Sequence, residues 1–252
     1  MCIRAKTNRD CKKDAPLYNV TYELEKKCMY PFLEDFQAVH KLYTSYNLLQ
    51  YMVSGEQLVA IDIGSSKIKA VIGEWTDEKK LRVLGIGVSE SRGIRKGNIL
   101  DMEQFKADLD IALGDAERMT GEQASHICLG VSGIHIDITR KSGIVAVAGL
   151  DVSEDDVNRA LDISQNGVDL MNRTILKVIP ESFSLDLESG IKNPVGMSGK
   201  KLEVRSHIIS ISANTLSNIQ KGVHDVGVEI MDTYPNILAS GEAMLSRRQR
   251  EL

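Results

Sequence analysis

Features that would assign a function directly are scarce in this chain of 252 residues. Its net charge is only −4, so it has no long-range attraction for nucleic acid or anionic lipid, and we expect no nucleic-acid partner. Apolar runs such as residues 144–150 are far shorter than the roughly 20 residues that a membrane helix needs. The first residues lack the apolar core of a secretory signal. We therefore expect a cytoplasmic location.

Metal-binding and nucleophilic residues are equally sparse. None of the four cysteines forms a Cys-x-x-Cys pair, and the five histidines lack metal-ligand spacing, which argues against a zinc site. Cys128 lies in an apolar run and is interpreted as a small buried hydrophobic residue. Ser206 and His207 share a predicted strand, but no third residue completes a hydrolase triad. No catalytic residue is assigned.

What is present divides the chain into two unequal parts. Residues 1–56 hold six of the seven tyrosines and three of the four cysteines, without clean strand or helix periodicity. We expect them to be an atypical leader, with Met52 as the natural start; a genuine accessory segment is the alternative. From residue 57 onward the chain becomes regular, and its 42% hydrophobic and 26% charged content is ordinary for a globular protein.

The regular part alternates strands and helices. The pattern predicts a helix after Asp101, with Gln104 as its capping partner, and a second helix from Ser153 and Asp156. Residues 190–199 contain three glycines and a proline and are predicted to be a loop. A helix near 216–226 and a final helix over 235–245 follow. Strands are predicted at 57–63, 67–75, 81–88, 126–131, 134–139, 143–148, 174–179, 182–187, 202–211 and 228–231. This order indicates an α/β fold with a mixed sheet packed by helices.

The most informative motif joins the first two predicted strands. Gly64 has no Cβ and would let a ligand approach the backbone closely. The N–H groups and hydroxyls of Ser65 and Ser66 can form an anion-binding concavity. Lys67 can neutralise a phosphate, and Asp62 is placed to hold hydrated Mg²⁺. The motif predicts polyphosphate binding, although the same residue types also fit a plain polar β-turn.

Resemblance to known families sharpens this prediction. Asp62-x-Gly64-Ser65-Ser66 resembles the first phosphate loop of the superfamily of actin, heat-shock chaperones and sugar kinases. Longer segments resemble the FtsA family of bacterial cell-division proteins within that superfamily: 61–74, 92–99, 131–133, 179–181 and 193–204. The Pro-Val-Gly-Met-Ser-Gly sequence at 194–199 is the most specific of these, because sister families lack it. The resemblance covers about residues 57–252.

The resemblance implies an actin-like, ribonuclease H-like α/β fold that carries a small inserted strand-helix-strand-strand domain. Residues 57–132 and 207–252 are expected to form the ATP-side subdomain. Residues 133–206 are expected to form the inserted interaction domain, and residues 1–56 lie outside both.

The resemblance also implies cofactors and partners. FtsA proteins bind ATP and Mg²⁺, polymerise, anchor the FtsZ ring to the cytoplasmic face of the membrane and recruit later division proteins. The expected cofactor-binding residues are Asp62, Gly64, Ser65, Ser66 and Lys67, with Asp62 also directed at the metal. The insert is expected to serve self-association and recruitment. Its candidate partner-binding residues are Asn193, Pro194, Val195, Gly196, Met197, Ser198 and Gly199.

The family has further parts that we do not expect within residues 57–252. They are the second phosphate loop, the adenosine pocket, the groove that binds FtsZ and a C-terminal amphipathic helix that binds the membrane. A nucleotide held from one side stays exposed to solvent, which screens its charge interactions. We therefore predict weak or undetectable ATP binding and no ATPase activity for this chain, with at most a weak ATPase at full length. A sugar-kinase-type phosphotransferase and a pilus-assembly ATPase remain alternatives on the same superfold.

Overall fold

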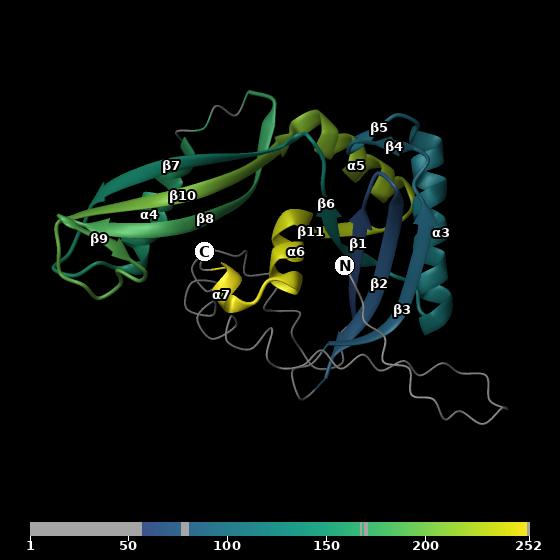
Figure 1. Ribbon diagram of the computed structural model, residues 1–252, viewed down its shortest axis with the longest axis horizontal. Helices are drawn as coiled ribbons and strands as arrows, with labels where there is room; N and C mark the ends of the chain where they lie inside the picture. Colours follow the sequence, from purple (N-terminus) through teal and green to yellow (C-terminus); the bar gives the residue numbers. More distant parts are fainter. Residues whose placement is uncertain (1–56, 77–80, 167, 169–170, 251–252) are drawn as a thin grey trace.

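The computed structural model describes residues 57–76, 81–166, 168 and 171–250, so the expectations for residues 1–56 lie outside it. The described residues form two α/β units, each a sheet with helical cover (Figure 1). The elements are β1 (Gln57–Ile63), β2 (Lys67–Trp75), β3 (Leu81–Glu90), β4 (Ile94–Arg95), β5 (Asn98–Ile99), α3 (Met102–Thr120), β6 (His126–Val131), β7 (Ile136–Ala146), α4 (Glu154–Asn166), β8 (Arg173–Leu185), β9 (Glu188–Ile191), β10 (Lys201–Ser212), α5 (Ala213–Asp225), β11 (Glu229–Pro235), α6 (Asn236–Met244) and α7 (Arg247–Arg250).

The first unit, which we call the body, contains a five-stranded sheet in the order β11-β6-β1-β2-β3. β1, β2 and β3 are antiparallel neighbours, whereas β1, β6 and β11 run parallel. The sheet is therefore mixed, and the predicted α/β fold class is confirmed. The strands β1, β2 and β6 begin and end within one residue of the predicted positions.

One face of the body sheet packs against α3 and α5. Every second residue of β1 points into this core, so that Val59, Ile61 and Ile63 are buried while Asp62 faces the other way. α3 contributes Phe105, Leu109 and further residues at helical spacing. The close fit requires glycine on β3, because a Cβ on Gly87 would lie 1.8 Å from the backbone oxygen of Ala112.

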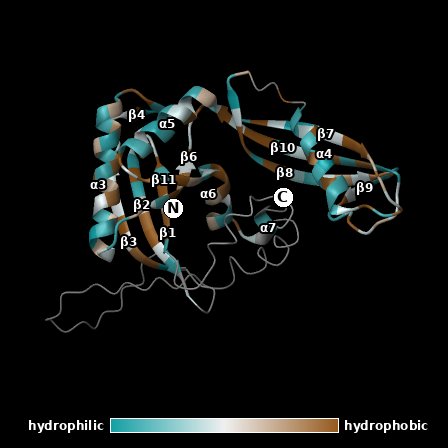
Figure 2. Cartoon of the chain, turned by 180° about the vertical axis from the view of Figure 1, so that it is seen from behind, coloured by the Kyte–Doolittle hydropathy of each residue, from teal (hydrophilic) through white to brown (hydrophobic). Residues whose placement is uncertain are grey.

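The second unit, which we call the insert, contains a four-stranded sheet in the order β7-β10-β8-β9, with α4 on one face. Its core is smaller and includes Val157, Phe183 and Leu202. Figure 2 shows hydrophobic and hydrophilic colours mixed along β8 and β10, and mainly hydrophilic colour on α4. A Cβ on Gly143 of β7 would lie 1.8 Å from the backbone oxygen of Ala160, so this glycine also marks a close helix approach.

The insert corrects two strand predictions. The expected strands 134–139 and 143–148 are one strand, β7, because the intervening residues 140–142 also pair with β10. The expected strands 174–179 and 182–187 are likewise one strand, β8. Pro180 is tolerated there because it lies at a bulge opposite β10, and β9 pairs only with residues 183–185. β9 is an additional short strand, so the loop predicted at 190–199 begins after Ile191.

The helix starts follow the predicted capping residues. The Asp101 side chain accepts a hydrogen bond from the N–H of Gln104 at 3.0 Å, and Gly121 ends α3 in the left-handed conformation. At α4, the Ser153 N–H donates to the carboxylate of Asp156 at 2.9 Å, which completes a reciprocal cap.

The body and the insert are joined by two chain crossings, between β6 and β7 and between β10 and α5, and by side chains (Figure 1). The Lys177 ammonium on β8 lies 2.9 Å from the Asp232 carboxylate on β11, and 5.2 Å from the ring centre of Tyr234. The Lys177 side chain is only 13% exposed, so this ion pair is largely shielded from water. We call these three residues the joint.

Candidate functional site

The predicted phosphate turn lies between β1 and β2. Gly64, Ser65 and Ser66 connect the strands, and the N–H of Gly64 donates to the carbonyl oxygen of Lys67 at 3.2 Å. A Cβ on Gly64 would lie 2.7 Å from that same oxygen. Only glycine therefore fits this turn without a backbone shift.

The turn is accessible. Ser65, Ser66 and Lys67 are exposed, and Gly64 is half-buried. The Asp62 side chain is 40% exposed, on the sheet face opposite the core. The turn lies at the carboxyl end of β1, beside the same ends of the parallel strands β6 and β11. In α/β sheets this edge is where ligands bind, so the five predicted cofactor residues lie together at a suitable position.

The carboxylate of Asp62 is held by two residues that were not predicted from the sequence. Its Oδ2 accepts a hydrogen bond from the ammonium of Lys69 at 2.8 Å, and its Oδ1 accepts one from the side-chain amide of Asn236 at 2.6 Å. Each carboxylate oxygen keeps a further lone pair. This geometry suits contact with a hydrated cation better than direct ligation of a bare one.

The contact between Asp62 and Lys69 could have been predicted from the sequence. A hairpin that turns at residues 64–66 sets Asp62 opposite Lys69, as the observed register does. Asn236 follows 174 residues after Asp62, and only the folding of α6 beside β1 brings them together. No local pattern could have found it.

A second turn, between β4 and β5, contacts the phosphate turn. The N–H of Gly97 donates to the hydroxyl oxygen of Ser65 at 3.0 Å. A Cβ on Gly97 would lie 2.6 Å from the carbonyl oxygen of Ser132, so the turn also packs directly on the end of β6. Three of the FtsA-like segments, 61–74, 92–99 and 131–133, therefore meet at one place.

A buried carboxylate fixes the start of this second turn. Asp108 of α3 is fully buried and accepts hydrogen bonds from the N–H groups of Arg92 (2.7 Å) and Gly93 (3.3 Å), and from the Arg92 guanidinium (2.8 Å). Burial alone would raise the pKa of Asp108, but the hydrogen bonds from Arg92, Gln104 and Gly93 lower it below its ordinary value. The carboxylate is therefore charged and anchors residues 92–93 to the helix.

The loop predicted to bind partners lies at the far end of the insert. Residues 194–197 form a turn, in which the N–H of Met197 donates to the carbonyl of Pro194 at 3.0 Å. Gly196 has φ +83°, as the third position of a type II turn requires. Paired backbone hydrogen bonds of 2.9 Å tie Gly196 and Met197 to Val152. This explains much of the specific Pro-Val-Gly-Met-Ser-Gly sequence by its structural role.

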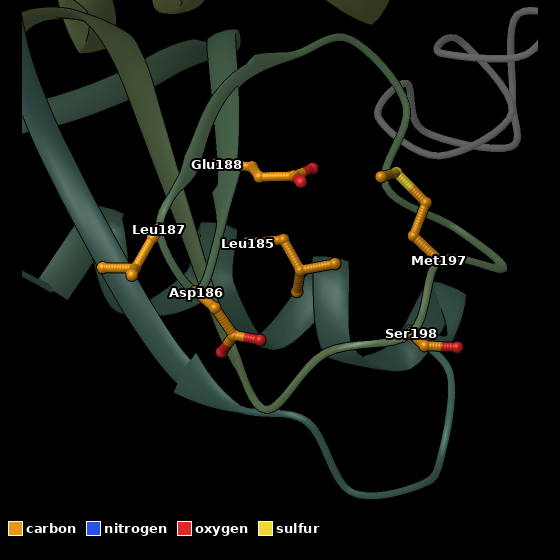
Figure 3. A pocket seen from close by; sticks show the side chains of 6 residues that line it. All are labelled: Leu185, Asp186, Leu187, Glu188, Met197 and Ser198. Carbon is orange, nitrogen blue, oxygen red and sulfur yellow. The ribbon is translucent and has the colours of Figure 1, made fainter.

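The same loop also presents groups to solvent. Asn193, Gly196 and Ser198 are exposed, while Pro194 is buried and Val195, Met197 and Gly199 are half-buried. Met197 and Ser198 form one wall of an open hollow of about 440 Å³, opposite the β8–β9 turn (Figure 3). Glu188 points across this hollow toward Met197, above Leu185 (Figure 3). That the loop binds a partner remains a prediction.

Cys128, interpreted from the sequence as a small buried hydrophobic residue, is half-buried on β6. Burial chiefly, with the nearby Asp232 carboxylate, raises the pKa of its thiol. A raised pKa favours the protonated thiol, which is the less nucleophilic form. Among the described residues, no helix is both long and apolar enough to cross a membrane.

Comparison with known proteins places the insert in a family. Residues 133–210 match the family model described as the SHS2 domain inserted in FtsA. This range starts at the residue where the insert was expected to begin, and it covers β7, α4, β8, β9 and most of β10.

Sequence relatives extend the match beyond the insert. The chain is 33% identical over 199 residues to cell division protein FtsA of Pseudomonas aeruginosa, covering 79% of this chain and 48% of the relative. It is 31% identical over 195 residues to that of Escherichia coli, covering 77% of this chain and 46% of the relative. The chain thus spans about half the length of the curated relatives it matches.

A solved structure supports the fold. A chain of a PilM-PilN type IV pilus biogenesis complex matches 73% of this chain, and 48% of its own length, with a TM-score of 0.52 and 9% sequence identity. At that identity the match shows the actin-like fold alone. With its SHS2 domain and its relatives at 31–33% identity, the chain belongs to the FtsA family as a partial-length member.

Proposed function

We propose that this chain supplies the first phosphate-binding turn and the interaction insert of an FtsA-like cell-division scaffold. The observation that carries the proposal is the convergence of three FtsA-like segments on one exposed glycine turn. That turn lies at the carboxyl edge of parallel strands, where polyphosphates bind in α/β folds.

The proposed ligand is ATP with Mg²⁺. The N–H groups and hydroxyls of Ser65 and Ser66 donate to phosphate oxygens, because they lie on the exposed side of the turn. Lys67 and Lys69 supply positive charge from alternate positions of β2. Asp62, oriented by Asn236, accepts hydrogen bonds from water bound to Mg²⁺.

The proposed partners follow from family membership. The insert serves self-association and recruits later division proteins, with the exposed residues Asn193, Gly196 and Ser198 as the first candidates for contact. Anchoring of the FtsZ ring at the cytoplasmic face of the membrane belongs, in this proposal, to the full-length scaffold. The ATP site is likewise completed there, so the affinity of this chain alone is in the millimolar range.

Thermal unfolding in the presence of ligand tests the ATP proposal. With ligand at ten times a millimolar dissociation constant, linkage predicts about 1.4 kcal/mol of stabilisation. We expect Mg-ATP at about 10 mM to raise the melting temperature by a few degrees, and adenosine to leave it unchanged.

Two alanine substitutions make this test specific. Gly64→Ala places a Cβ 2.7 Å from the Lys67 oxygen and should abolish the ATP effect. Gly149→Ala meets no atom closer than 3.6 Å and should preserve it. Equal stabilisation of the wild type by adenosine, or an undiminished ATP effect in Gly64→Ala, would count against the site.

A further inference from the structure

We propose that the turn between β4 and β5 orients the phosphate turn, with Gly97 as the positioning residue for the Ser65 hydroxyl. The inference rests on the proposed phosphate site and assigns a role to residues outside it. Gly97 is not expected to touch the ligand; it acts through Ser65.

The hydrogen bond from Gly97 to Ser65 determines which kind of ligand group the Ser65 hydroxyl prefers. A serine hydroxyl has one proton to donate and two lone pairs that accept. The N–H of Gly97 occupies one of these lone pairs at 3.0 Å. The hydroxyl proton must then point away from Gly97, and Ser65 is an exposed residue. The contact removes one of the two accepting positions and leaves the donor proton free, which shifts the hydroxyl toward ligands that accept hydrogen bonds, such as a phosphate oxygen.

The second turn is rigid enough to impose this orientation. Lys96 has φ +53° and Gly97 has φ +81°, the successive left-handed residues of a tight two-residue hairpin turn. Gly97 also faces Gly133 at the end of β6: a Cβ on Gly133 would lie 2.9 Å from the Cα of Gly97. Two glycine backbones in contact hold the turn against the body sheet.

The start of the turn is anchored as well. The buried carboxylate of Asp108 binds the N–H groups of Arg92 and Gly93, two residues before β4. A Cβ on Gly93 would lie 2.5 Å from the backbone nitrogen of Phe105, so the chain cannot shift away from α3 cheaply. Helix α3 thus fixes the second turn, and the second turn fixes Ser65.

Alanine substitutions at two similar glycines distinguish the positioning of Ser65 from a general loss of stability. Gly97 and Gly121 have nearly the same backbone conformation, φ +81° and φ +77°. Alanine is strained at both. A Cβ on Gly121 meets nothing within 4 Å, whereas one on Gly97 displaces the turn from Ser132. Both variants should lose stability, but only Gly97→Ala should disturb the phosphate turn.

Nuclear magnetic resonance of the ¹⁵N-labelled full chain, titrated with Mg-tripolyphosphate, provides the test. In the wild type, the amides of residues 64–67 should shift on titration. Loss of one oriented hydrogen bond corresponds to about a tenfold weaker affinity, which we expect for Gly97→Ala and not for Gly121→Ala. Without ligand, Ser65→Ala should move the amide resonance of Gly97, because it removes the acceptor.

Each outcome has a distinct meaning. If the wild type shows no shift at residues 64–67, the phosphate site is wrong and the inference falls with it. If the wild type binds and Gly97→Ala binds equally well, only the inference is overturned. Should Gly97→Ala fail to fold, Ser65→Ala decides. An unmoved Gly97 resonance, or unweakened tripolyphosphate binding, in this exposed-site variant would overturn the inference.

Discussion

The body and the insert are built on the same plan at different scales. In each, a helix lies so close to a sheet that one strand residue must be glycine: Gly87 beneath Ala112 in the body, and Gly143 beneath Ala160 in the insert. Each also buries one helical carboxylate almost completely, Asp108 at 0% and Asp156 at 1% exposure.

The two units differ in what the buried carboxylate holds. Asp156 accepts hydrogen bonds from Ser153 and Ala148, so it closes the loop that precedes its own helix. Asp108 accepts from Arg92 and Gly93, and so fixes a segment that reaches the phosphate turn. In the insert, the buried carboxylate therefore stabilises the loop before its own helix, whereas in the body it supports a candidate binding site.

Replacing glycine by alanine where a helix packs closely against a strand should destabilise either unit. Gly87→Ala and Gly143→Ala place a Cβ 1.8 Å from a backbone oxygen, so a helix must move. We expect a loss of about 3 kcal/mol in the free energy of unfolding for each, measured by urea denaturation.

A glycine within α3 is the control for that pair. Gly114 has nothing within 4 Å of its Cβ position. Gly114→Ala should therefore stabilise the helix by about 0.5–1 kcal/mol. A destabilisation by Gly114→Ala as large as that by Gly87→Ala would contradict close packing as the cause.

Removing the carboxylate of Asp108 should cost somewhat less. Asp108→Ala leaves the N–H groups of Arg92 and Gly93 without their acceptor, and we expect a loss of about 2–3 kcal/mol. Asp110 is exposed on the same helix, and Asp110→Ala should change stability by less than about 0.5 kcal/mol. Equal effects of the two substitutions would argue against the anchoring role of Asp108.

The insert carboxylate predicts a pH dependence. Hydrogen bonds from Ser153, chiefly from its hydroxyl, lower the pKa of Asp156 from 3.8 to about 2. Because the folded-state pKa is lowered, this stabilisation is complete above pH 4 and is lost as the pH falls toward 2. It amounts to roughly 2 kcal/mol. Asp156→Asn should flatten stability over this range, apart from the contribution of Asp108. An unchanged pH profile would refute the assignment.

The joint between the units should show the smallest effect. Lys177→Met keeps the apolar stem but leaves Asp232, 24% exposed, without its ammonium partner. We expect a loss of about 1 kcal/mol, with faster amide hydrogen exchange in β8 and β11 and little change in α3. Unchanged exchange in β8 would show that the Lys177–Asp232 ion pair does not hold the units together.

The sequence predicted the fold class and most of the body, because alternation in β1 and helical spacing in α3 are local signals. It split β7 at the polar residues 140–142, which in the structure pair with β10 without interruption. In the site it found the turn residues but missed Asn236 and Asp108, which act across 174 and 16 positions. Long-range partners leave no local pattern.

The central claim is that the turn at residues 64–66 binds the phosphates of ATP, and amide chemical shifts of the ¹⁵N-labelled chain during a titration with Mg-ATP test it most directly. We expect saturable shifts at Gly64, Ser65, Ser66 and Lys67 at millimolar concentrations, with smaller shifts at Lys69 and Asn236. Shifts confined to other parts of the chain, or none at the turn up to about 20 mM, roughly twenty times the millimolar dissociation constant proposed above, would contradict it.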